Sequence, residues 1–137
     1  SGDVEFYLTG NMSTAYKVRL LNVFRGISIS GIAPHFSLWN GSPESGGLEL
    51  TGDNYARVPL IFAAPMEQAN GQLMTETSKA AAFNRPSTAW GRWNHSAIFS
   101  AASGGEAVYW QQLPEEIPIK KGYMPMMEQG AVKVGIN

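Results

Sequence analysis

The chain has no cysteine, which excludes disulfides, thiolate zinc ligands and cysteine nucleophiles. It also has little charge: Asp, Glu, Lys and Arg make up 15% of its 137 residues, against about 25% in an ordinary globular chain. The net charge is −1 and there is no basic run, so a concentrated positive surface for nucleic acid is not expected. No apolar run approaches the roughly 18 residues of a membrane span. The expected partners are therefore neither nucleic acids nor membranes.

A low charge content has two readings. It is typical of a subunit that buries its outer surface against neighbouring proteins, and it is also found in neutral β-proteins rich in glycine and serine. The chain has 15 glycines, and its length suits one domain. Composition alone leaves both readings open.

Patterns typical of catalysis are missing. Glu115 and Glu116 are adjacent, so in a strand they would point to opposite sides and could not act as a carboxylate pair. No serine lies in a Gly-x-Ser-x-Gly elbow, and the glycines of 102–106 have no P-loop lysine. We interpret His35 and His95 as core or interface residues; the alternative is a ligand or proton-transfer pair. The sequence predicts no enzyme, no cofactor and no metal site.

One helix is expected, over Ser13–Arg25. Tyr16, Leu20, Val23 and Phe24 recur at helical spacing and would form one face, and Gly26 is placed to end the helix.

After the helix the apolar pattern alternates with period two, which is typical of strands. Pro59 cannot donate a ladder hydrogen bond, so its strand is expected at a sheet edge or a bulge. The segment Met66–Thr77 is polar and weakly patterned, and we expect a loop there. The predicted fold is mainly β, an antiparallel β-sandwich or open barrel with one short N-terminal helix. The expected strands are His35–Trp39, Arg57–Phe62, Asn94–Ser100, Ala107–Leu113 and Ala131–Ile136, with weaker ones near Ala80–Phe83 and Ile117–Met127.

The first eleven residues differ in character from the rest of the chain. Val4, Phe6 and Leu8 alternate with polar or amphipathic neighbours, as in a strand. Met12 is followed by small hydroxyl residues and reads like a natural start, although it also fits an ordinary internal position. We interpret 1–11 as a tag, a fusion sequence or an added strand that pairs with a sheet edge of its own chain or of a neighbour. Residues 12–137 are expected to form a single β-sandwich domain.

The four tryptophans are the other conspicuous feature. Partly exposed tryptophans with polar neighbours are the usual platform for sugar rings. Trp90 and Trp93, with Arg92 between them, are therefore a candidate ligand or partner surface, with burial in the core as the alternative. Trp39 and Trp110 are expected in the core.

Several segments, in order, resemble a family of small tailed-bacteriophage virion proteins, described as tail-fibre-like or minor tail structural proteins. They are "AYKVRLLNVFRG", "HFSLWNGSPESGG", "ELTGDNYARVPLIF", "TAWGRWNHSAIFSAASGGEAVYW" and "IPIKKGYMPMMEQGAVKVGIN". The resemblance runs from about Tyr16 to the C-terminus. It implies a non-enzymatic virion component, assembled in the host cytoplasm, that packs against itself as a trimer or ring or against other virion proteins. A module of the virion that binds a host-surface glycan is the alternative.

The stretch around Tyr55 and Arg57 is expected to be structural. Gly52, Asp53 and Asn54 suit a tight turn with positive φ. Such a turn would bring Tyr55 to the edge of the core and let Arg57 fork to a carboxylate or to backbone carbonyls. The hypothesis is a structural clasp made by Tyr55 and Arg57.

Overall fold

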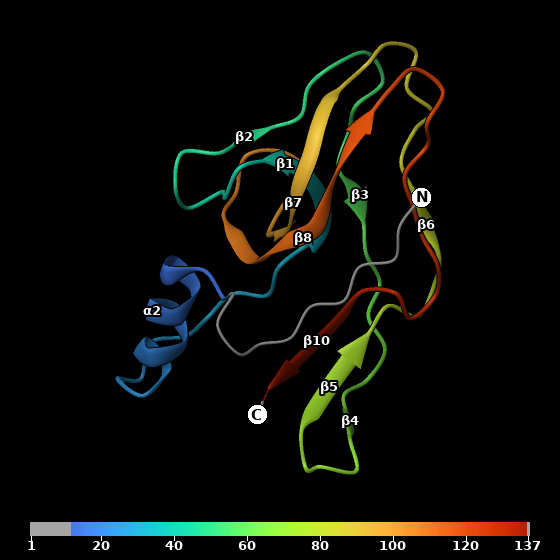
Figure 1. Cartoon of the computed structure of the whole chain (residues 1–137). Helices are drawn as coiled ribbons and strands as arrows, with labels where there is room; N and C mark the ends of the chain where they lie inside the picture. The colour runs from blue at the N-terminus through green and yellow to red at the C-terminus, as the bar shows by residue number, and fades with distance from the viewer. Residues whose placement is uncertain (1–11, 137) are drawn as a thin grey trace.

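The structure, a computed structural model, describes residues 12–136 and shows one helix and ten short strands in three antiparallel sheets (Figure 1). The N-terminal eleven residues, and with them the predicted strand of Val4, Phe6 and Leu8, lie outside the described residues. The elements are α2 Thr14–Val23, β1 His35–Asn40, β2 Leu48–Glu49, β3 Val58–Pro59, β4 Met66–Glu67, β5 Leu73–Glu76, β6 Ala81–Ala82, β7 Gly91–Phe99, β8 Ala107–Ile119, β9 Met126–Met127 and β10 Lys133–Ile136.

The largest sheet has the order β2-β1-β7-β8, with β3 also paired to β1. Phe36 of β1 lies opposite Ile98 of β7, and both are buried in the core. β8 is at the edge of this order, which explains how a strand of 13 residues accommodates Pro114 and Pro118, because a missing N–H is tolerated there. β3 pairs with β1 alone among the described strands, so the edge position expected for Pro59 is confirmed.

Two smaller sheets complete the fold. One has the order β10-β5-β4 and lies below the large sheet in the view of Figure 1; the other pairs β6 with β9. The loop predicted at Met66–Thr77 was wrong, because this segment forms part of the β10-β5-β4 sheet. Met66 pairs with Met74 in a β4–β5 hairpin, which is closed by the turn at Gly71 (φ 83°). Both hairpin strands are exposed or half-buried, so they lack the clear alternation that marks a strand with one covered face.

One hydrophobic core joins the three sheets. Phe36 and Trp93 come from the large sheet, Phe83 follows β6, Met127 belongs to β9, and Val132 precedes β10; all are buried. The predicted fold class, mainly β and antiparallel with a single short N-terminal helix, is confirmed.

The helix begins where predicted, ends at Val23 rather than Arg25, and packs differently. Ser13 caps α2, since its Oγ accepts a hydrogen bond from the Tyr16 N–H at 3.1 Å, and Gly26 follows with φ 80°. No residue of α2 is buried, so the predicted apolar face does not enter the core. Phe24, just after the helix, is 90% exposed. Among the described residues no helix is long and apolar enough to span a membrane.

Candidate functional site

The most highly connected polar group in the described chain is the guanidinium of Arg57. Its Nε and Nη2 donate to the two carboxylate oxygens of Glu49 at 3.0 and 2.9 Å. Its Nη1 donates to the backbone carbonyls of Ala101 and Gly104 at 3.0 and 2.8 Å. The same group lies 4.0 Å above the centre of the Phe99 ring. Arg57 thus connects β2 to the turn between β7 and β8.

Tyr55 joins the same carboxylate from the core side. Its hydroxyl donates to Glu49 Oε2 at 2.5 Å and accepts the backbone N–H of Leu38 at 3.1 Å. Burial, and then the bond to Glu49, raise the pKa of Tyr55 far above its ordinary value, so the phenol stays protonated as a donor. Sequence reasoning expected a carboxylate or backbone carbonyls as partners of Arg57, and the structure shows both kinds. It did not identify Glu49, eight residues earlier, as the carboxylate.

The turn before Tyr55 is held by a tryptophan. Asn54 has φ 68°, a left-handed conformation that asparagine tolerates. Trp90 donates its indole N–H to the carbonyl of Asp53 at 2.7 Å and meets the Tyr55 ring edge-on at 5.1 Å. A Cβ added at Gly52 would lie 2.5 Å from Trp90 Cδ1, so only glycine lets the chain pass this close to the indole.

The predicted ligand surface at Trp90, Arg92 and Trp93 is not an open platform. Trp90 is 4% exposed and Trp93 is 1% exposed. The indole N–H of Trp93 is occupied by Ser96 Oγ at 2.8 Å. Arg92 alone faces solvent, paired with Glu116 at 2.9 Å. The structure therefore supports the core alternative for both rings, and a sugar cannot stack on them.

Trp39 and Trp110, expected in the core, are instead half-buried on the other face of the large sheet. Trp39 stacks on Phe99 with 5.5 Å between ring centres. Trp110 donates to Glu44 Oε1 at 2.8 Å and lies 5.9 Å from the ring of His95. Burial lowers the pKa of His95. The prediction for these two tryptophans was wrong because strand alternation does not say which face of a sheet is covered.

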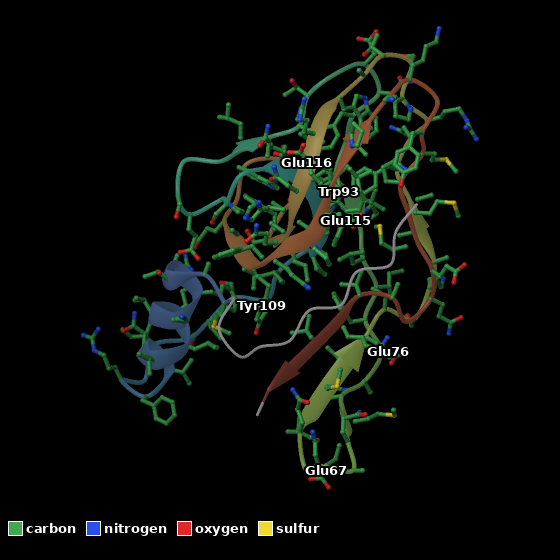
Figure 2. All side chains as sticks on the ribbon, in the orientation of Figure 1. Glu67, Glu76, Trp93, Tyr109, Glu115 and Glu116 are labelled. Atoms are coloured by element: carbon green, nitrogen blue, oxygen red, sulfur yellow. The ribbon has the colours of Figure 1, made fainter. Side chains whose placement is uncertain are left out.

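The acidic residues and the two histidines do not lie close together at one site. Figure 2 shows Glu67 and Glu76 on the lower hairpin, far from Glu115 and Glu116 on β8. Within residues 12–136 no three His, Cys, Asp or Glu side chains gather as a metal site would require. His35 and His95 lie at opposite ends of the β1–β7 ladder, opposite Phe99 and Trp39 respectively, and are not a pair.

Comparison with known proteins assigns the chain to a family. No curated protein matches the chain. Residues 11–135 match the family described as "Podophage GP4 fiber I protein gp80". This range begins one residue before Met12 and covers the domain described above. The predicted resemblance to tail-fibre-like virion proteins is confirmed, and the chain belongs to the podophage GP4 fiber I protein gp80 family, a phage fibre family.

Proposed function

We propose that this chain is a structural fibre subunit that assembles by burying the surface of α2 against copies of itself or neighbouring virion proteins. The observation that carries the proposal is the exposure of large apolar side chains on and just after the helix. Leu21 is 67% exposed and Phe24 is 90% exposed. Soluble monomers rarely expose several large apolar side chains this close together. The group, here called the α2 surface, comprises Val18, Leu20, Leu21, Val23, Phe24 and Ile27.

The helix is firmly placed even though it buries nothing. The Ser13 N–H donates to the Val108 carbonyl at 2.9 Å. The Thr14 N–H donates to Glu44 at 3.0 Å, and the same carboxylate accepts the indole N–H of Trp110. Arg19 is paired with Glu106. A helix held in position at its N-terminus with an apolar surface turned outward is suited to docking, since little order has to be gained on binding.

The charged residues on and near the helix indicate what kind of partner surface would fit it. Lys17, Arg19 and Arg25 lie within 14–31, and this stretch contains no acidic residue. Arg19 is already paired with Glu106, and Lys17 is close enough to Glu44 to help lower the pKa of that carboxyl. This leaves Arg25, which donates to the neutral Asn22 side chain at 3.1 Å, as the cation at the rim of the α2 surface. The complementary partner surface is apolar at its centre and acidic at its rim. We further propose that the subunit closes into a trimer or ring and is assembled in the host cytoplasm.

In the proposed structural subunit, the contacts of Tyr55 and Arg57 have a supporting role. We interpret them as a clasp that fixes β2, β3 and the β7–β8 turn relative to one another. The carboxylate of Glu49 is the shared acceptor, and the neighbouring surface hollow holds no metal-type cluster among its described residues. A clasp of this kind stabilises the sheet that carries the helix and performs no chemistry.

The proposal is tested by light scattering of the full chain and of two charge variants. Phe24→Asp places a charge on the α2 surface, whereas Ile61→Asp places one at a 53% exposed apolar position away from it. Burial of one Phe contributes about 1.5–3 kcal/mol, so Phe24→Asp should weaken association by at least tenfold. Ile61→Asp should leave the solution mass unchanged. Equal association in both variants would overturn the proposed role of the α2 surface, and a monomeric parent would overturn docking on copies of the same chain.

A further inference from the structure

An apolar groove lies between the large sheet and the β10-β5-β4 sheet. Its volume is about 330 Å³, and none of its described lining residues is charged. Among them, Ile98 and Val108 are buried, whereas Phe62, Tyr109 and Val134 are only half-buried. Figure 2 places Tyr109 between the two sheets. A hollow of this kind is suited to receive an apolar side chain of a partner.

The face of the small sheet that lines the groove continues beyond it. Thr75 and Val134 line the groove and lie directly opposite each other in β5 and β10. Alternate residues of a strand share a face, so Leu73 lies on the same face as Thr75. Glu67 is opposite Leu73 and therefore shares this face as well. The groove face, meaning the groove together with Leu73 and Glu67, is thus apolar with an acidic edge.

Both edge residues of the groove face are accessible. Leu73 is 48% exposed. Glu67 is exposed on the lower hairpin in Figure 2 and forms no ion pair with another described residue. A partner that is apolar at its centre and basic at its rim would therefore fit this face.

The α2 surface has that arrangement. Leu21 and Phe24 are three residues apart in helical backbone, so their side chains are neighbours, and Arg25 follows at the rim. Phe24 is 90% exposed, so it does not fill the groove of its own chain. A cavity of about 150 Å³ accepts a benzene ring, so a groove of about 330 Å³ has room for the Phe24 ring and an aliphatic side chain such as Leu21.

We propose that the α2 surface of one copy docks on the groove face of a second copy, with Phe24 in the groove and Arg25 beside Glu67. This docking rests on the proposed function and adds the surface that receives the helix. Because the two surfaces are different parts of the chain, the contact is head-to-tail. Each chain then offers one α2 surface and one groove face, and a closed ring uses all of them.

The first test places charges on the two faces of the small sheet in the full chain and measures solution mass by light scattering. Ala63→Glu puts a carboxylate at an exposed residue that lines the groove, and Leu73→Asp puts one at its edge. Each should weaken association by roughly tenfold or more. Met66→Asp is the matched control, because Met66 is 62% exposed on the opposite face of the same hairpin. It should leave the mass unchanged, and equal loss in all three variants would contradict the docking.

The second test asks whether the contact is head-to-tail. An equal mixture of Phe24→Asp and Leu73→Asp chains still contains an intact α2 surface and an intact groove face, on different chains. The mixture should therefore form pairs although each variant alone associates poorly, and a mixture that stays monomeric would overturn the docking. Arg25→Glu and Glu67→Lys should each weaken association by about two- to fivefold, and the double variant should recover most of that loss.

Failure of this docking and failure of the proposed function give different results. If Phe24→Asp lowers the mass but Ala63→Glu and Leu73→Asp do not, the α2 surface assembles on another surface and only the groove face is wrong. If none of the three lowers the mass of an associating parent, the role of the α2 surface is overturned together with the docking. A monomeric parent would overturn any docking between copies.

Discussion

Replacing Arg57 by alanine tests the clasp most severely. The Arg57 side chain is 9% exposed and its partner Glu49 is 22% exposed. Removing one partner of a buried ion pair costs about 3–5 kcal/mol, because the remaining charge stays desolvated. Glu49 keeps the Tyr55 hydroxyl and some solvent contact, so we expect a somewhat smaller cost, about 2–4 kcal/mol. At about 3 °C per kcal/mol for a domain of this size, Tm should fall by roughly 6–12 °C.

The assay is urea and thermal unfolding at fixed protein concentration, with Arg92→Ala as the control. Arg92 also pairs with a glutamate, but its side chain is 72% exposed, so its loss should cost only about 0–1 kcal/mol. The double variant Arg57→Ala, Glu49→Ala should be less destabilised than the sum of the two single changes, by about 1–3 kcal/mol. Equal stability of the Arg57 and Arg92 variants, or simple additivity with Glu49, would refute the clasp.

Three further changes probe the turn at Gly52, the core and a histidine of the large sheet. Gly52→Ala forces a Cβ to within 2.5 Å of the buried Trp90 ring, so it should lower the free energy of unfolding in urea by about 1–3 kcal/mol. The control Gly31→Ala, with open space around it, should lower it by less than about 1 kcal/mol. Equal effects of the two changes would contradict the packing of the turn. Trp93→Ala should destabilise by about 3–5 kcal/mol because the ring is fully buried, and Trp110→Ala by clearly less; the reverse order would contradict the assignment of core and surface rings. Because burial lowers the pKa of His95 below 6.5 in the folded state, the unfolded chain protonates its imidazole first as the pH falls. The free energy of unfolding should therefore decrease as the pH drops from about 6.5 towards the lower folded pKa. In His95→Gln the urea midpoint should not show this dependence on pH, and a dependence that persists would belong to another group.

The helix and the main strands could be predicted from local patterns in the sequence. The strands around Phe36, Ile98 and Val108 were predicted from their apolar pattern, and the serine cap at Ser13 and the glycine at Gly26 flank the helix. The β4–β5 hairpin was not predicted, because neither strand buries one face and so neither shows an alternating apolar pattern. Its register is set by pairing with β10, which is distant in sequence.

The candidate site was only partly predictable for a related reason. The sequence identified Tyr55 and Arg57 as a clasp pair, but the identity of Glu49 as the acceptor depends on the pairing of β2 with β1. The burial of Trp90 depends on contact with Gly52, which is far away in the sequence. Local alternation cannot reveal such contacts, so the core prediction for Trp39 and Trp110 was wrong and the choice between surface and core for Trp90 and Trp93 stayed open.

The central claim, that this member of a phage fibre family is a structural part of the virion, is tested most directly by quantitative mass spectrometry of purified particles of the encoding phage. We expect the chain in the particles at a fixed number of copies per virion that survives repeated purification. Absence of the chain from the particles, or a copy number that falls with each purification step, would contradict the claim.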